Sequence, residues 1–169
     1  MILNSCVKCS TEKNPAQSKE NINYIDIKKS NFAINGEKWI IDNNNNSILL
    51  DTNLLMIKDL VIAGNNQSLS INSDILKGEK DSLNLIFNKF SLDQFNALLK
   101  TSALNMSGKI NGDLNLKGLY TSLYFDAELN ITDWKVNNQD FGNANITSNF
   151  DTEMECIHVT LQSNLEKDN

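Results

Sequence analysis

The side chains best suited to metal or redox chemistry in this chain are three cysteines and one histidine. Cys6 and Cys9 form a C-x-x-C pair, a spacing found in zinc sites and in thioredoxin-like redox centres. A zinc site would need a second pair of ligands at finger-like spacing, but Cys156 and His158 lie almost the full length of the chain away. A redox centre would need a β-α-β context, and a polar stretch without pattern follows Cys9 instead. We therefore predict no metal site and no role for the pair.

No set of residues suited to catalysis is recognisable in the sequence. G-x-G-x-x-G, P-loop, H-E-x-x-H and G-x-S-x-G motifs do not occur. Glu153 and Glu155 share one face of a predicted strand, where a solvated edge explains them as well as an acid–base role does. His158 lies in the alternating string IHVTLQS, which predicts an outward-facing strand residue. The expectation is a protein that is not an enzyme and has no catalytic residue or cofactor.

Composition and charge limit the possible partners. The chain has 169 residues, 40% of them hydrophobic, which is enough for one domain or for a segment of a larger protein. A net charge of −6 and a pI near 4.7 argue against nucleic acid as a partner. No run approaches the ~20 apolar residues of a membrane-spanning helix. Asparagine makes up about one residue in six, which we interpret as compositional bias rather than function.

The chain divides into a polar beginning and a long β-rich part. Residues 1–21 show no pattern and are predicted to be a disordered leader, whereas 22–169 are predicted to form one β-rich segment. Asn35-Gly36 is the best two-residue hairpin signal, because a type I′ turn needs positive φ at both central residues. One segment has helical spacing instead: SLDQFNALLK predicts a short helix over about 91–100, with Ser91 as its cap.

Alternation between apolar and polar side chains is strongest from Met106 to Thr132. The residues predicted to share one apolar face of these two strands are Ile110, Leu114, Leu116, Leu123, Phe125, Leu129 and Ile131. A single hairpin cannot offset the conformational entropy of its own ordering, so the pattern requires neighbouring strands. The sequence therefore predicts one continuous antiparallel sheet with a single apolar face.

Two structures would satisfy a sheet with one apolar face. It can pack against a second sheet as a sandwich, or it can curl into a trough whose inner wall stays open to an apolar ligand. Gly112, Gly118 and Gly142 lie in phase with the apolar residues, and glycine in a strand permits bending and close approach. This favours the curled trough and leaves the sandwich as the alternative.

Small-residue strands recur at fixed points after the predicted helix. They are Met106-Ser107-Gly108, Ile110-Asn111-Gly112, Leu116-Lys117-Gly118, the strand from Leu123 to Ile131, and the strand from Phe141-Gly142 to Asp151. This order resembles the TamB-like translocation and assembly module proteins of the AsmA group, and the segments before it resemble the Bacteroidetes-like members. The resemblance covers about 22–163. Tyr120-Thr121-Ser122 stands where that family usually has a proline. The family's amino-terminal anchor and carboxy-terminal domain are not in the sequence, so we expect a fragment of a larger repetitive protein.

The resemblance implies an elongated, U-shaped antiparallel sheet, a β-taco, with one short helix. It also implies a periplasmic location as part of an inner-membrane-anchored envelope protein. The implied role is phospholipid transport between membranes or outer-membrane protein assembly. Lipid acyl chains would then lie against the seven apolar residues named above, and an outer-membrane barrel protein would be a partner of the parent chain. The alternative is a secreted or surface-exposed β-sandwich that acts as an adhesin or binds glycans through its aromatic residues, Trp39, Tyr120, Tyr124 and Trp134.

Overall fold

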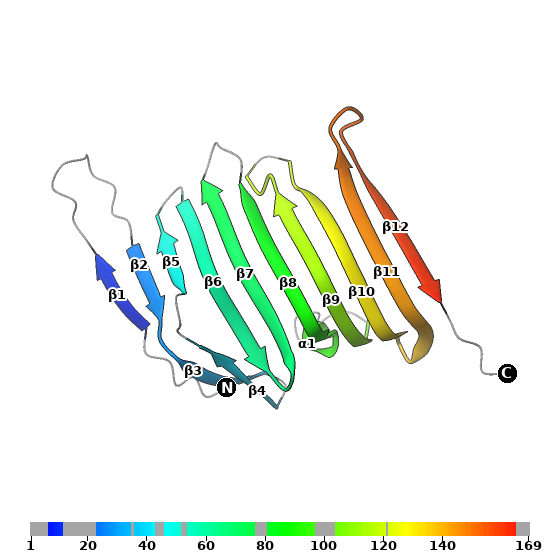
Figure 1. Cartoon of the computed structure of the whole chain (residues 1–169), viewed down its shortest axis with the longest axis horizontal. Helices are drawn as coiled ribbons and strands as arrows, with labels where there is room; N and C mark the ends of the chain where they lie inside the picture. The colour runs from blue at the N-terminus through cyan, green and yellow to red at the C-terminus, as the bar shows by residue number, and fades with distance from the viewer. Residues whose placement is uncertain are drawn as a thin grey trace.

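The computed structural model describes residues 7–11, 23–34, 36–42, 46–51, 54–76, 81–96, 104–120 and 122–164. They form one open, antiparallel, twelve-stranded sheet with one short helix (Figure 1). The predicted mainly β fold class is confirmed. The elements in chain order are β1 (Val7–Thr11), β2 (Asn23–Ile27), β3 (Ser30–Ile34), β4 (Glu37–Ile41), β5 (Ser47–Leu50), β6 (Leu54–Gly64), β7 (Gln67–Leu76), β8 (Ser82–Ser91), α1 (Asp93–Asn96), β9 (Met106–Lys117), β10 (Tyr124–Val136), β11 (Gln139–Asp151) and β12 (Cys156–Asn164).

From β5 to β12 each strand pairs with the next along the chain. Two of the connecting turns consist of two asparagines, Asn65-Asn66 and Asn137-Asn138, and all four residues have positive φ. Asparagine tolerates this left-handed conformation, and the twist of such a turn suits a hairpin. The hairpin predicted at Asn35-Gly36 joins β3 to β4; Gly36 has φ 81°, and Asn35 lies outside the described residues.

The β3–β4 hairpin leaves the main order of the sheet. β6 pairs with β5 over its first half and with β4 near its end, where Ile41 lies opposite Ile62. The segment from Tyr24 to Ile34 therefore contains two strands with different partners: β2 pairs with β1 and β5, whereas β3 pairs only with β4. Figure 1 shows this hairpin at the lower end of the sheet, close to α1.

The predicted helix is present but begins later than expected. α1 covers Asp93–Asn96, and residues 97–100 lie outside the described part of the chain. Ser91 ends β8, and its hydroxyl donates to Asp93 Oδ2 at 2.7 Å. Asn96 ties the helix to β9, because its side chain donates to the Met106 carbonyl at 2.7 Å and accepts from the Met106 amide at 2.9 Å.

The predicted disordered leader contains a strand. Val7–Thr11 pairs with β2 over its whole length, so the prediction was wrong for these residues, and the rest of 1–21 lies outside the described part. Pairing with an open strand edge satisfies backbone groups even where the hydrophobic pattern is weak, which explains why periodicity did not reveal β1.

Apolar side chains of neighbouring strands lie directly opposite one another in three rows across the sheet. Residues paired in this way share one face. The first row is Ile41, Ile62, Leu69, Phe87, Gly112, Leu129, Ile146 and Leu161. The second is Leu60, Ile71, Leu85, Leu114, Ala127, Ser148 and Val159. The third is Ile25, Ile48, Ile57, Ser73, Leu83, Leu116 and Phe125. We call the face formed by these rows the apolar face.

Gly112 lies in the first row between Phe87 and Leu129, and its φ is 120°. A Cβ at this position would overlap the Glu128 carbonyl of β10. The sheet therefore needs glycine here for two reasons, the backbone conformation and the close approach of β10.

Replacing Gly112 with alanine is expected to lower the free energy of unfolding by at least about 3 kcal/mol, because backbone strain and overlap with a carbonyl add together. Gly36→Ala is the matched control, since Gly36 also has positive φ but a Cβ there would meet no atom within 4 Å. Gly36→Ala should lower the free energy of unfolding by only about 1–2 kcal/mol. Urea denaturation measures both, and equal losses would show that the close approach to Glu128 is unimportant.

Candidate functional site

The lower end of the apolar face is a closed hydrophobic core. Its buried residues are Trp39, Phe87, Phe90, Leu92, Ile110, Ala127, Leu129, Ile131 and Ala144. The rings of Trp39 and Phe90 are 5.6 Å apart, and those of Phe90 and Phe95 are 5.5 Å apart. Because Trp39 belongs to β4 and Phe95 to α1, these two elements cover the apolar face at this end.

A polar network around Glu37 holds this cover on the sheet. Glu37 Oε2 accepts from Gln67 Nε2 at 2.7 Å and from Gln94 Nε2 at 3.1 Å, so the carboxylate joins β4, β7 and α1. Gln67 is buried, and its Oε1 accepts from the Ser91 amide at 2.8 Å. Gln94 of α1 thus binds a strand that is distant in the sequence. The adjoining hollow, of about 350 Å³, is lined by polar residues that include Lys89.

The opposite end of the apolar face is only partly covered. Leu83, Leu116 and Phe125 of the third row lie opposite one another and are half-buried. Leu83 and Leu116 do not belong to the buried cluster or to the residues packed against it. At the β12 edge the exposure is greater: 57% of Val159 and 53% of Leu161. The apolar face therefore has a closed end and a partly open end, although Ser73 and Ile75 of β7 are buried at the latter.

Three β-bulges of the same form lie in β6, β8 and β10, and β11 has a further irregularity at Phe141, which has no partner between Asp140 and Gly142. In β6, Lys58 and Asp59 together oppose a single residue of β7, because Ile57 pairs with Ser73 and Leu60 with Ile71. The corresponding pairs of residues are Asn88-Lys89 in β8 and Thr132-Asp133 in β10. The second residue of each bulge has positive φ: 52° at Asp59, 48° at Lys89 and 54° at Asp133.

Each bulge is closed by an asparagine on the following strand. The amide of Asp59 donates to Asn72 Oδ1 at 2.9 Å. The amide of Lys89 donates to Asn111 Oδ1 at 2.8 Å, and that of Asp133 to Asn143 Oδ1 at 3.2 Å. In all three the acceptor is the single residue that opposes the bulge. These asparagines bind backbone amides that the bulge removes from the ladder, so composition alone does not account for them.

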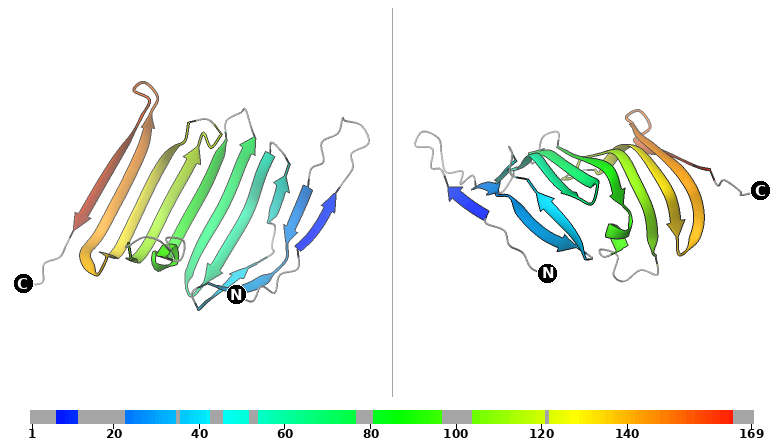
Figure 2. Two further views of the ribbon diagram at one scale, coloured as in Figure 1. Left: turned by 180° about the vertical axis from the view of Figure 1, so that it is seen from behind. Right: turned by 60° about the horizontal axis from the view of Figure 1, so that its bottom comes forward.

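Bulges bend a sheet and increase its twist. The three are staggered along the strands, because the bulge of β6 lies between the third and second rows whereas those of β8 and β10 lie beyond the first row. The strands curve along their length (Figure 2). Each bulge also keeps the apolar residues on one face: Phe87 and Phe90 are three positions apart, yet both belong to the buried cluster. The sequence analysis missed this signal, an apolar–polar–polar–apolar string that occurs as IKDL, FNKF and ITDW.

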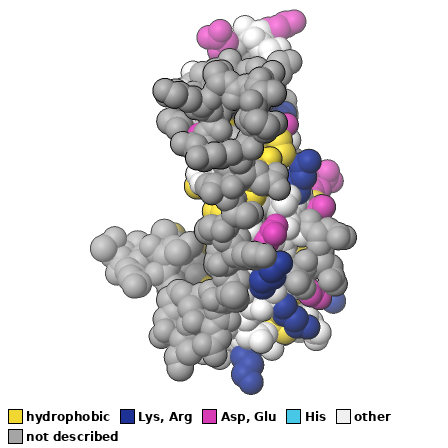
Figure 3. Space-filling model, turned by 90° about the vertical axis from the view of Figure 1, so that its left-hand side faces the viewer, with side chains coloured by type: hydrophobic (Ala, Val, Ile, Leu, Met, Phe, Trp, Pro, Cys, Tyr) yellow, Lys and Arg dark blue, Asp and Glu magenta, His cyan; other side chains and the backbone are white. Residues whose placement is uncertain are grey.

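The second face of the sheet is polar. Lys117 of β9 pairs with Asp126 of β10, with 2.7 Å between Nζ and Oδ2, and Asp126 Oδ1 accepts from the Phe150 amide of β11 at 3.2 Å. The hydrogen bond from Lys117 lowers the pKa of Asp126, partial burial opposes this shift, and the Phe150 amide reinforces it. Seen from the β1 edge, most visible charged side chains gather along one side of the molecule (Figure 3).

The register brings six of the seven predicted groove residues together. Ile110 lies opposite Ile131, Leu116 opposite Phe125, Leu114 opposite Ala127, and Leu129 opposite Gly112. Ile110, Leu129 and Ile131 are buried at the closed end, whereas Leu114, Leu116 and Phe125 are half-buried.

Leu123 is the exception among the predicted groove residues. It precedes β10, which begins at Tyr124, and 60% of its surface is exposed. Its place in the predicted strand was wrong, because alternation alone does not show where pairing ends.

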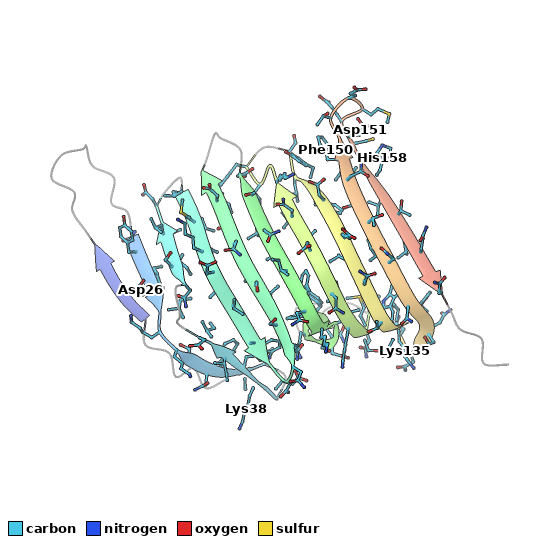
Figure 4. The ribbon with its side chains drawn as sticks, viewed as in Figure 1. Asp26, Lys38, Lys135, Phe150, Asp151 and His158 are labelled. Atoms are coloured by element: carbon cyan, nitrogen blue, oxygen red, sulfur yellow. The ribbon has the colours of Figure 1, made fainter. Side chains whose placement is uncertain are left out.

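Among the side chains that the structure describes, the chemically reactive ones meet at the β11–β12 turn (Figure 4). His158 Nε2 lies 3.5 Å from Cys156 Sγ and 3.6 Å from Asp151 Oδ2. One ring nitrogen thus faces both groups, whereas a nucleophile–base–acid relay uses one nitrogen for each. Amides of Met154 and Glu153 lower the pKa of Asp151. Among the described residues, no group of three or more His, Cys, Asp or Glu is placed to hold a metal ion.

The aromatic residues considered for glycan binding do not form a strip. Trp39 is buried with 2% of its surface exposed, and Trp134 packs on Phe141 with 4.9 Å between their rings. The rings of Tyr124 and Phe150 stack with their centroids 4.3 Å apart. Tyr120 is exposed in the loop between β9 and β10. All strands described belong to one sheet, so this part of the chain contains no second sheet to complete a sandwich.

Comparisons with protein-family models, with curated proteins and with solved structures find no match to this chain. No helix in the described ranges is long and apolar enough to cross a membrane. The apolar face is therefore the feature on which a functional proposal can be based.

Replacing Asn111 with alanine should destabilise the protein by about 1 kcal/mol and speed hydrogen exchange of the Lys89 amide, because that amide loses its acceptor. Asn111→Asp, which keeps an acceptor oxygen, is the matched control and should retain slow exchange. The role of Asn111 in closing the bulge is excluded if both variants exchange at the wild-type rate.

The Lys117–Asp126 pair predicts a small pH dependence of stability. The pKa of Asp126 lies below its ordinary value of 3.8. The ion pair therefore contributes fully to the stability of the fold above pH 3.8, and this contribution is lost as pH falls through the folded-state pKa. Because both side chains are about one-third exposed, the pair is worth about 0.2–1 kcal/mol after screening. Asp126→Asn should lower stability at neutral pH and converge with the wild type in acid. Thermal unfolding across this range tests it, and a constant difference would contradict the assignment.

Proposed function

We propose that this chain is a segment of a TamB-like envelope protein whose apolar face carries lipid acyl chains. In this proposal the segment lies in the periplasm, within an inner-membrane-anchored parent protein that moves phospholipid between membranes or supports outer-membrane protein assembly. An outer-membrane barrel protein is the expected partner of the parent chain. The resemblance of the sequence and the partly open apolar face both support this role.

The observation that carries the proposal is the continuity of the apolar face across a single layer of strands. The first row extends from β4 to β12, the second from β6 to β12 and the third from β2 to β10. Neighbouring strands lie only about 4.8 Å apart, so an acyl chain leaving one strand already contacts the next. Each methylene that leaves water gains about 0.8 kcal/mol. Movement along such a face proceeds without exposing the chain to solvent and needs no cofactor in the wall.

The closed and open ends have different roles in this proposal. The buried cluster around Trp39 and Phe90 leaves no room on the lower end, so it fixes the curvature of the sheet. The half-buried Leu83, Leu116 and Phe125 offer the contact surface. A lipid would bind with its acyl chains on these residues and its headgroup toward solvent.

A photo-reactive amino acid at Leu116 should crosslink to acyl chains when the chain is mixed with phosphatidylethanolamine vesicles. The same amino acid at Asn115 is the matched control, because Asn115 is the neighbouring residue of β9 and lies on the polar face. Mass spectrometry of the crosslinked protein then measures lipid at both positions. Equal labelling at Leu116 and Asn115 would contradict binding on the apolar face.

Replacing Leu116 or Phe125 with aspartate should abolish lipid crosslinking to a photo-reactive amino acid at Leu83, which lies opposite Leu116. Leu116 is half-buried and does not pack against the buried cluster, so circular dichroism of its variant should remain that of a folded sheet. Phe125 is half-buried but packs against that cluster, so its variant is compared only once circular dichroism establishes folding. Unchanged lipid capture in folded variants would rule out acyl-chain transport as the role of this face.

A further inference from the structure

The hollow beside the Glu37 network has a polar wall that carries two lysines. Its volume is about 350 Å³, which lies in the range of sites for small molecules. The wall is formed by the start of β4, the turn between β6 and β7, the end of β8 and the first half of β9. Every described residue on it is polar, so the hollow suits a polar ligand.

The two lysines on this wall, Lys89 and Lys109, keep their charges unpaired within the described part of the chain. Both are exposed, and none of the ion pairs found among the described residues includes either of them. The carboxylate on the same wall is Glu37, whose Oε2 already accepts from two amide side chains. Two lysines and one glutamate give the wall a local excess of one positive charge, in a chain whose net charge is −6. Such an excess attracts anions.

Lys89 differs from the residues at the corresponding position of the other two bulges. The second bulge residue is Asp59 in β6 and Asp133 in β10, and all three residues have φ between 48° and 54°. Aspartate is enriched in this left-handed conformation because its short side chain can bond locally, whereas lysine has no such advantage. Neither aspartate lines the hollow. The backbone therefore does not account for a lysine at this position, and a residue that departs from its local preference is expected at a functional site.

We propose that Lys89 and Lys109 bind the phosphate group of a phosphorylated molecule in this hollow. A phosphate ester carries close to two negative charges and three strongly accepting oxygens, so it matches two lysines better than a carboxylate does. The side-chain amides of Asn65 and Asn66 on the same wall are further donors. A hydroxyl group elsewhere on the molecule can donate to Glu37.

This site is separate from the surface proposed for acyl chains. The hollow adjoins the closed end of the apolar face, whereas Leu83, Leu116 and Phe125 lie opposite one another at the other end. The phosphate group can belong to a soluble ester or to a lipid headgroup, and two probes distinguish these sources. Crosslinking at Leu116 reports only on the other end, so failure of one proposal is distinguishable from failure of the other.

Isothermal titration calorimetry of the full chain in phosphate-free buffer tests the site with glycerol 3-phosphate and with dihexanoyl phosphatidic acid. Both should bind, and more weakly as the salt concentration rises. Lys109→Gln should raise Kd about tenfold, as expected for the loss of one charge-assisted hydrogen bond. Lys58→Gln is the matched control, because Lys58 is also exposed and belongs to a bulge but does not line the hollow, so Kd should not change. Tighter binding of the lipid would identify a headgroup as the source, and equal binding would identify the phosphate group of either molecule.

Lys89→Asn separates a binding role from a structural one. Asparagine tolerates the left-handed conformation better than lysine, so thermal unfolding should occur at the same temperature or higher. The Kd of glycerol 3-phosphate should nevertheless rise about tenfold. A Kd unchanged by substitution of Lys89 and Lys109, an equal rise with Lys58→Gln, loss of stability together with binding, or no binding of either probe would each overturn the proposal.

Discussion

The alternation of side chains between the two faces of a strand is the constraint on which this structure depends. In a single-layered sheet a shift of one residue would move every later apolar side chain to the polar face. β6, β8 and β10 each contain one extra residue, yet their apolar side chains stay on one face because the extra residue is held in a bulge. Asn72, Asn111 and Asn143 bind the displaced amides, so three hydrogen bonds preserve both the bend and the apolar face.

The bend divides the apolar face into parts with different physical properties. Below it, β4 and α1 cover the sheet, and aromatic packing around Phe90 supplies a core that a flat ribbon would lack. Beyond it Leu83, Leu116 and Phe125 are half-buried, whereas Ser73 and Ile75 of β7 are buried. The buried core thus lies at one end of the strands, and the Glu37 network keeps the covering elements at that end.

Much of the fold follows from local sequence signals, and the remainder depends on distant contacts. Period-two alternation located the strands around Ile110 and Leu129, and Asn35-Gly36 located a hairpin. The bulges escaped notice because apolar residues three apart, as in FNKF, fit neither the strand nor the helix period. Pairing of β4 with the far end of β6 is set by the aromatic core, which no local pattern encodes. The half-covered state of Leu116 likewise depends on where α1 and β4 end.

Because the asparagine-closed bulges occur in β6, β8 and β10, the smallest unit that repeats them is a pair of strands, one with the extra residue and one with the asparagine that closes it. Such a unit carries its own contribution to the bend and begins and ends in the same direction. A sheet of this kind can gain or lose strands in pairs while its cross-section stays constant. Its length is then free to vary independently of its shape.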